Sequence, residues 1–192
     1  MDEQVLHKMV KVLESGGVVV FPTDTVWGVG VDSGNDGAIR RMYQIKNREA
    51  GKPTALLVAN LSQAKTLGEF NEKALALAWE HWPGALTVIV PKASDNTVSS
   101  LITGEGGFVG LRAPDSELIQ KAIEMLGRPL VASSANFSGG EAPTRRVDVD
   151  PKLSEYVDYV VDTEEETSGK ASTVVRVNGN DISVLRQGEV QL

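Results

Sequence analysis

Apolar residues recur along this chain in two spacings, which predict helices and strands in alternation. Residues 3–14 carry Leu6, Val10 and Leu13 at helical spacing, and Gly16-Gly17 follows as a helix end. Short continuous apolar runs bounded by turn residues are typical of buried strands. On this basis helices are expected at 3–14, 36–45, 62–67, 71–81 and 115–126, and strands at 18–21, 27–31, 54–59, 86–90, 108–112, 130–133, 159–161, 173–177 and 182–185.

The segments between these elements are rich in turn-forming residues. Asp95–Gly107 and Phe137–Asp150 contain many glycines and polar residues, which predicts surface loops. Asn178-Gly179 between two apolar runs predicts a hairpin. Because helices and strands are interleaved, and strands dominate towards the C-terminus, the pattern favours a single α/β domain on a mixed sheet.

The composition limits the class of protein. With 192 residues, of which 41% are hydrophobic and 23% charged, the chain has the make-up of a globular domain with one core. It has no cysteine, which excludes disulfides, thiolate metal sites and cysteine nucleophiles. No apolar run is long enough to span a membrane, and the first residues lack the pattern of a signal peptide. We therefore expect a cytoplasmic protein with no membrane partner.

The net charge of −7 argues against a surface that binds nucleic acid everywhere, but positive charge is concentrated in one segment. Cations near a helix end also favour the helix dipole, so one lysine there needs no ligand. So many cations, followed directly by an apolar strand, indicate an anionic partner such as a triphosphate. The five cations, which have only one acidic neighbour between them, are Arg40, Arg41, Lys46, Arg48 and Lys52.

Polar side chains follow three of the predicted strands at the points where the strands end. Pro22-Thr23-Asp24-Thr25 follows the first strand, Arg112 ends another, and Ser133-Ser134-Ala135-Asn136 ends a third. These groups are suited to binding phosphate, ribose or a carboxylate. Pro, Asp, Ser and Asn also favour ordinary turns, and an internal salt bridge would equally satisfy the arginine. The pattern predicts one pocket to which several strand ends contribute.

Standard sequence motifs for nucleotide and metal binding are absent. No segment matches the phosphate-binding loop that ends in Gly-Lys-Ser/Thr, or the Gly-x-Gly-x-x-Gly turn. His7 and His81 have no companion at the spacing of metal ligands, so we expect no metal held by the protein itself. Trp79 and Trp82, on either side of the second histidine, are expected to pack against the sheet.

Seven short motifs occur in order along the chain: Gly-Gly-x-Val-x-x-Pro-Thr-Asp-Thr-Val-x-Gly from Gly16, Lys46-Asn47-Arg48, Trp82-Pro83-Gly84-Ala85-Leu86-Thr87, Gly110-Leu111-Arg112, Ser133-Ser134-Ala135-Asn136, Ala171-Ser172-Thr173-Val174 and Leu185-Arg186-x-Gly188. In this order they resemble the YrdC/TsaC family of threonylcarbamoyl-AMP synthases over nearly the whole chain. The resemblance implies a single YrdC-like domain over residues 1–192, with a twisted mixed sheet and flanking helices around a basic concave pocket. It also implies a reaction in which L-threonine, bicarbonate or CO2 and ATP give threonylcarbamoyl-AMP and pyrophosphate. That product is used to form N6-threonylcarbamoyladenosine at position 37 of tRNA.

The resemblance further implies roles for the residues at matching positions. Lys46 and Arg48 would be catalytic, because cations beside the phosphates stabilise the charge of the transferring group. Arg112 would hold the carboxylate of the amino acid. The threonine site as a whole would comprise Thr25, Arg112, Ala132 and Ser172.

ATP, accompanied by Mg2+, would bind to a second group of residues near the first. Two positions depart from the family pattern: Trp27 replaces a usual tyrosine, and Leu57 stands where some longer relatives carry a histidine near the threonine. By the resemblance, the residues that hold ATP would be Arg48, Lys52, Ser134, Asn136 and Arg186.

Two other functions are open at this stage. A basic concavity is also suited to the phosphate backbone of double-stranded RNA or tRNA, and tRNA or the tRNA-modifying transferase machinery is an expected partner in either case. A related carbamoyl-adenylate enzyme of hydrogenase maturation is the second alternative. Enzymes of that kind have additional zinc-finger parts, which a chain without cysteine does not have.

Overall fold

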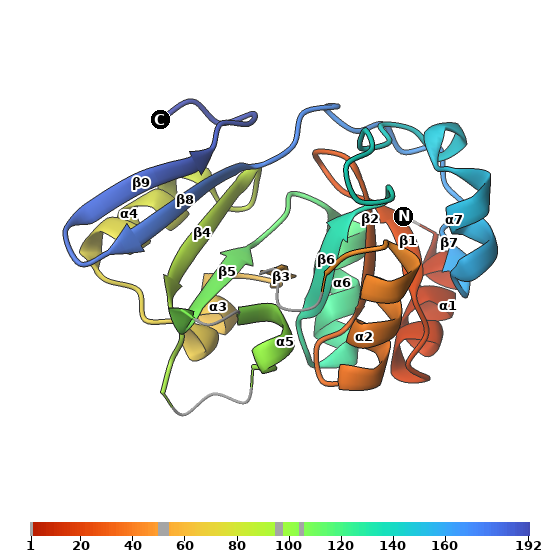
Figure 1. The fold of residues 1–192 in the computed structure, drawn as a ribbon, viewed down its shortest axis with the longest axis horizontal. Coiled ribbons are helices and arrows are strands. Elements are labelled where there is room, and N and C mark those ends of the chain that lie inside the picture. Colours follow the sequence, from red (N-terminus) through yellow and green to blue (C-terminus); the bar gives the residue numbers. More distant parts are fainter. Residues whose placement is uncertain (1, 50–53, 95–97, 104–105) are drawn as a thin grey trace.

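The computed structural model describes residues 2–49, 54–94, 98–103 and 106–192. At its centre is a nine-stranded mixed sheet with the strand order β7-β1-β2-β6-β3-β5-β4-β8-β9 (Figure 1). The predicted α/β fold on a mixed sheet is therefore confirmed. The strands are β1 Val19–Pro22, β2 Trp27–Asp32, β3 Ala55–Leu57, β4 Leu86–Pro91, β5 Phe108–Arg112, β6 Leu130–Ser134, β7 Tyr159–Val160, β8 Thr173–Asn178 and β9 Asp181–Arg186.

Most helices begin at a residue whose side chain caps the first turn. Asn35 accepts a hydrogen bond from the Ala38 amide at 3.0 Å. Ser116 caps the helix that begins at Glu117 in the same way. Gly127 ends that helix in the left-handed conformation, at φ 70°. The helices are α1 Glu3–Glu14, α2 Asp36–Ile45, α3 Leu61–Leu67, α4 Glu72–His81, α5 Ser100–Thr103, α6 Glu117–Leu126 and α7 Pro151–Tyr156, with a 3-10 turn η2 at Arg146–Asp148.

The two faces of the sheet are covered differently. On one face, side chains such as Leu56, Val88 and Val131 pack with residues of α2, α3 and α4 in one large core. On the other face, Phe21 and Leu130 pack with α1 and α6 in a second core. The strand residues of this second core come from β7, β1 and β6, with Leu57 from the end of β3. No helix of the described residues forms a core over the half formed by β5, β4, β8 and β9.

The twist of the sheet turns this uncovered half towards the viewer of Figure 1. Helices α2 and α4 pack on the same face, yet α2 lies in front of the sheet on the right and α4 behind it on the left. Neighbouring strands rotate by about 20–25° each, so nine strands accumulate roughly half a turn. The opposite face, without a helix on the left, is therefore presented as a concave surface.

Three predictions about individual segments were wrong. The loop expected at Asp95–Gly107 contains the helix α5, although some of its residues lie outside the described part. Helix α7, capped by Asp150, was not expected. Trp79 is 76% exposed and does not pack on the sheet, whereas Trp82 packs edge-on against Phe70. Among the described helices, none has the length and apolar character needed to cross a lipid bilayer.

Candidate active site

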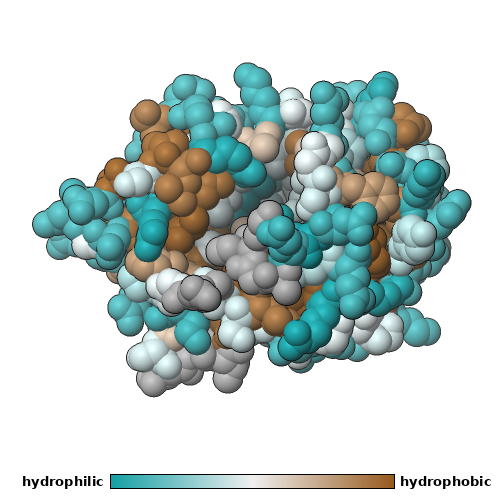
Figure 2. Space-filling view, in the orientation of Figure 1, coloured by the Kyte–Doolittle hydropathy of each residue, from teal (hydrophilic) through white to brown (hydrophobic). Residues whose placement is uncertain are grey.

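A cavity of about 1120 Å³ lies over the uncovered half of the second face. Its walls come from the strands β2, β3, β4, β5, β6, β8 and β9, from the turn before β2, from the segment after α2, and from α5. Figure 2 shows the same side of the molecule, with a hollow beside apolar side chains that gather over β8 and β9. The volume is large enough for a nucleotide and a second small substrate together.

Small residues form the floor of this cavity. The register places Ala55 on β3 directly between Ala132 on β6 and Gly110 on β5, and all three line the cavity. The neighbouring residues along each strand point to the opposite face, because side chains alternate along a strand. A ligand can therefore approach the sheet more closely here than over the half with larger side chains.

Arg112, at the end of β5, is 6% exposed, and each of the three nitrogens of its guanidinium donates to an oxygen of the protein. Its Nε donates to the carbonyl of Gly84 at 2.9 Å and one terminal nitrogen donates to Oγ1 of Thr25 at 2.9 Å. The other terminal nitrogen forms an ion pair with Asp24. The arginine predicted to bind a carboxylate is thus held in a fixed orientation, with a carboxylate already beside it.

The turn that carries Thr25 is locked by its own side chains. Oγ1 of Thr23 donates to the carbonyl of Val26 at 2.7 Å and accepts from the amide of Val26 at 3.2 Å. Later segments hold the same turn from outside, because the amide of Gly169 donates to the carbonyl of Thr25 at 2.8 Å. The Pro-Thr-Asp-Thr motif therefore forms a turn, and the same turn is a wall of the cavity.

A second arginine enters the cavity from β9. Arg186 donates from Nε to the carbonyl of Ser172 at 3.1 Å, and from a terminal nitrogen to Oγ of Ser172 at 3.0 Å. The same hydroxyl lies 3.0 Å from Oγ1 of Thr87 on β4. Burial, together with the nearby positive charge of Arg112, lowers the pKa of Arg186. Both arginines line the cavity, and the repulsion between them favours an anionic ligand there.

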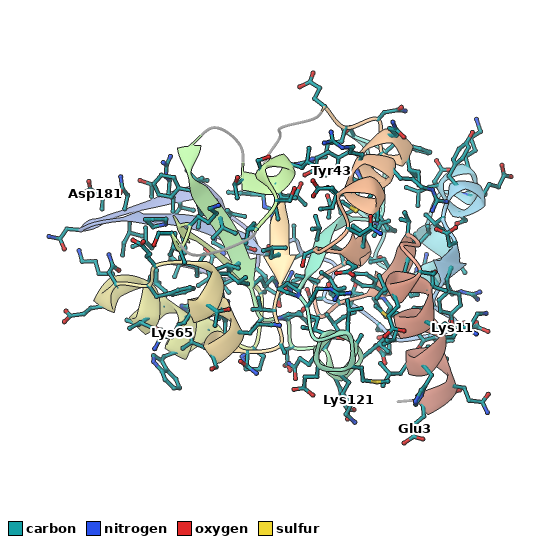
Figure 3. All side chains as sticks on the ribbon, turned by 90° about the horizontal axis from the view of Figure 1, so that it is seen from below. Glu3, Lys11, Tyr43, Lys65, Lys121 and Asp181 are labelled. Atoms are coloured by element: carbon teal, nitrogen blue, oxygen red, sulfur yellow. The ribbon has the colours of Figure 1, made fainter. Side chains whose placement is uncertain are left out.

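The third cationic wall lies where α2 ends. Arg48 lines the cavity, and the centre of its guanidinium lies 5.9 Å from the centroid of the Tyr43 ring. Tyr43, labelled in Figure 3, lies beside α5 and connects α2 to it through a hydrogen bond to the carbonyl of Leu101. Its hydroxyl also lies 2.7 Å from Oγ1 of Thr54. Ser134 lines the same cavity.

Lys46, for which a catalytic role is expected, lies behind the described lining of the cavity and not in it. Lys46 is 2% exposed and is not among the described residues that line the cavity. Its ammonium donates to the carbonyls of Ser134 and Asn136, each at 2.5 Å, and burial followed by repulsion from Arg48 lowers its pKa to about 8. In this structure Lys46 therefore positions the loop after β6, and its catalytic role stays a prediction.

Asn136 also supports this loop from behind the cavity wall. Its side-chain amide donates to the carbonyls of Phe137 and Gly140 at 2.8 and 2.7 Å, and its oxygen accepts from the hydroxyl of Ser134. It does not line the cavity among the described residues, so direct binding of ATP by its side chain is not supported. Lys52, also expected at the ATP site, lies outside the described residues.

Seven of the residues expected from the sequence thus line one cavity, namely Thr25, Arg48, Arg112, Ala132, Ser134, Ser172 and Arg186. The structure adds Thr87, which ends the motif that begins at Trp82, and also Phe108 and Arg176, to which the sequence analysis assigned no role. Four arginines and no acidic residue are among the described residues that line it. Within the described part of the chain, no three His, Cys, Asp or Glu side chains come together as a metal site.

Comparison with known proteins places this geometry in a family. The family model for Sua5, YciO and YrdC, which carries the description "Telomere recombination", matches residues 11–188. The chain belongs to the Sua5/YciO/YrdC family. The resemblance seen in the seven motifs is thereby confirmed.

Relatives in this family include chains of two lengths. A threonylcarbamoyl-AMP synthase of Pyrococcus abyssi is 34% identical over 94% of this chain, which spans only 53% of that relative. A threonylcarbamoyl-AMP synthase of Photobacterium profundum is 31% identical over 95% of this chain and 98% of its own length. Similarity thus extends to proteins that match the chain almost from end to end.

One solved structure links the fold to a ligand. The crystal structure of P. abyssi Sua5 complexed with L-threonine superposes with a TM-score of 0.91 at 33% identity. The alignment covers 98% of this chain and 55% of that protein. The chain therefore corresponds to about half of that Sua5 protein.

Proposed function

We propose that this chain is a threonylcarbamoyl-AMP synthase that uses L-threonine, bicarbonate or CO2, and ATP. Membership of the family and the names of relatives at 31–34% identity support this function. The observation that carries it is one cavity lined by Arg48, Arg112 and Arg186 together with Thr25 and Ser172, without an acidic residue in the described lining. Such a cavity suits two anionic substrates that must be brought together.

The reaction needs no nucleophile from the protein. The neutral amine of threonine adds to CO2 with release of a proton, or to bicarbonate with loss of water, to give a carbamate anion. A carbamate oxygen then attacks the α-phosphorus of ATP, and the bond from that phosphorus to the pyrophosphate oxygen breaks. Because an anion attacks a polyanion, the barrier depends on neutralising charge and on holding both groups in line.

The three arginines divide this task by their positions. Arg112, oriented by Thr25 and Asp24, is suited to the threonine carboxylate, and binding there would replace or share the contact with Asp24. Arg48 and Ser134 form the wall suited to the phosphates. Arg186 lies near both Ser172 and Arg112, so we assign it to the transferring phosphoryl group between the two substrates.

Mg2+ belongs to this proposal as the companion of ATP. The described lining offers hydroxyls and guanidinium groups but no carboxylate, so the phosphates and water would supply its ligands. We further propose a cytoplasmic reaction whose product passes to the machinery that modifies tRNA. The acyl phosphate of the product is readily hydrolysed, which favours rapid transfer.

The experiment that tests this function is detection of the adenylate itself. Purified chain is incubated with ATP, Mg2+, isotopically labelled bicarbonate and each amino acid in turn, and the product is identified by mass. Threonylcarbamoyl-AMP that contains the label, with pyrophosphate released only when threonine is present, is the expected result. Arg48→Ala should abolish most of this release while circular dichroism shows a retained fold.

The alternatives predict different outcomes in the same assay. Carbamoyl phosphate as the required substrate in place of threonine and bicarbonate would indicate the related carbamoyl-adenylate chemistry. Salt-sensitive RNA binding that ATP does not displace, without formation of an adenylate, would indicate an RNA-binding protein. Either result would refute the proposed function.

A further inference from the structure

The cavity contains a fourth arginine to which the proposed reaction assigns no role. Arg176 lies on β8 in register with Ile89 on β4. The centre of its guanidinium lies 3.8 Å from the centroid of the Phe108 ring on β5. Since β4 lies between β8 and β5, the arginine side chain reaches across a strand to make this cation–π contact.

The hydrogen bonds of Arg176 distinguish it from the two arginines nearer the strand ends. Arg112 and Arg186 donate to oxygens of the protein. In the part of the chain that the structure describes, no group accepts a hydrogen bond from Nε of Arg176, although this atom is buried. A buried donor without an acceptor costs free energy, so this position favours a ligand that brings acceptors of its own.

The surroundings of Arg176 are apolar, which limits the kind of ligand. Ile89, Val174 and Leu185 line the cavity beside it, and Leu185 is 58% exposed although it is a large hydrophobic residue. Val174 and Leu185 belong to β8 and β9, over which apolar residues gather in Figure 2, and Ile89 lies on the adjacent strand β4. A compact phosphate has no apolar surface to place against them. A planar heterocycle has an apolar face for the wall and nitrogen acceptors at its edge for the guanidinium.

The length of β5 is sufficient to separate a heterocycle near its first residue from a carboxylate near its last residue. Phe108 begins the strand and Arg112 ends it, so with a rise of about 3.3 Å per residue they stand about 13 Å apart. That separation leaves room for a ribose and an α-phosphate between a base at Phe108 and an amino-acid carboxylate at Arg112.

We propose that Arg176 and Phe108 bind the nucleobase of the nucleotide substrate. The base stacks against the arginine–phenylalanine pair and the neighbouring apolar wall, and a ring nitrogen accepts a hydrogen bond from the guanidinium. The presence of a nucleotide in this cavity rests on the proposed function. The assignment of the base to this position rests on the contact between Arg176 and Phe108 and on the buried Nε of Arg176.

The test compares a ligand that has a base with one that lacks it. Isothermal calorimetry measures the dissociation constants of ATP and of inorganic tripolyphosphate for the wild type, Arg176→Lys and Phe108→Leu. Both substitutions keep the net charge of the cavity and remove the stack, so a general electrostatic effect is avoided. ATP should bind roughly tenfold more weakly to either variant, and tripolyphosphate should bind as before.

Arg48→Lys is the matched control at the wall assigned to phosphates, and it should weaken both ligands together. Unchanged ATP binding in both variants, or equal weakening of ATP and tripolyphosphate in Arg176→Lys, would overturn the inference. If one variant fails to fold by circular dichroism, the other carries the test. Because calorimetry requires no turnover, a wild type that makes no adenylate refutes the proposed function and leaves this comparison intact.

Discussion

One face of the sheet is divided into two halves that differ in what covers them. Over β1, β2 and β6, large side chains such as Phe21 and Leu130 meet the apolar sides of α1 and α6. Over β5, β4 and β8, the equivalent positions hold Gly110, Ile89 and Arg176, and a cavity takes the place of helices. The same alternation of side chains along a strand thus produces a core in one half and a binding site in the other.

The half covered by helices stabilises the fold, and the uncovered half provides the binding site. The covered half removes apolar surface from water and so contributes to the free energy of folding. The uncovered half holds several guanidinium groups in one hollow, where their mutual repulsion opposes folding until an anion is bound. Substitutions in the two halves should therefore change different measured quantities, and four experiments test this.

The largest effect is expected from Arg112→Ala in the uncovered half. The substitution removes the proposed carboxylate ligand and leaves Asp24 without its partner. We expect kcat/KM for threonine to fall by about 10³-fold, since removing one partner of a buried charge pair between a protein and its ligand costs about 2–5 kcal/mol. The assay is threonine-dependent release of pyrophosphate. An unchanged kcat/KM would refute the assignment of Arg112 to the carboxylate.

The matched change in the covered half is Phe21→Ala. The ring is fully buried, and a Cβ at Gly30 would lie 3.0 Å from it, so no neighbour can fill the space without rearrangement. The free energy of unfolding should fall by about 3–4 kcal/mol in urea denaturation. KM for threonine should stay within twofold of the wild type at a temperature where the variant is folded. A large rise in KM would show that the two halves are not separable.

The buried Lys46 should make the free energy of unfolding depend on pH. Its pKa is about 8 in the folded protein and 10.5 as the ordinary value, so between these pH values the unfolded chain binds more protons. The charged form is penalised by burial below pH 8, and the penalty disappears as the pH rises to 10.5. The free energy of unfolding should thus rise across this window, by up to about 3 kcal/mol.

The measurement is urea denaturation of the wild type and of Lys46→Met at several pH values between 7 and 10.5. The difference between the two proteins isolates Lys46 from other groups that titrate in the same range. A difference that stays constant with pH would contradict the lowered pKa. In the variant the Ser134–Asn136 loop also loses two hydrogen bonds, so turnover should fall moderately.

The smallest effect is expected at Gly188. A Cβ there would lie 2.2 Å from the carbonyl oxygen of Ala171 and 2.5 Å from the carbonyl carbon of Ser172. Gly188→Ala should displace Ser172 and raise KM for threonine about tenfold, since that corresponds to only 1.4 kcal/mol. Gly179→Ala is the control, because its Cβ would contact nothing within 4 Å and only its φ of 57° is unfavourable. If both variants lower stability alone, Gly188 has no part in positioning the site.

Local signals predicted many of the elements. Helix α2 was predicted with its observed limits because apolar residues recur at helical spacing, and the structure adds a cap at Asn35. The hairpin of β8 and β9 was predicted from Asn178-Gly179, and the register pairs Asn178 with Asp181. Helix α7 was missed although Asp150 and Pro151 form a recognisable helix start, so that signal was available.

The site was predicted less completely, because several of its contacts depend on the strand order. The motifs led to Thr25, Arg112 and Ser172, which come together as expected. The contacts of Lys46 with the loop after β6 were not predicted, since its carbonyl partners lie 88 and 90 residues away in the sequence and no local pattern reveals them. Arg176 and Phe108 meet only because β4 separates β8 from β5, which periodicity cannot indicate.

The strand order β6-β3-β5-β4-β8 has a consequence for how the protein responds to its ligands. Segments from the first third, the middle and the end of the chain each supply part of one hollow, so a cut in any connecting loop separates groups that must act together. A bound substrate should accordingly protect distant loops from proteases at the same time, and isolated fragments should retain no partial affinity.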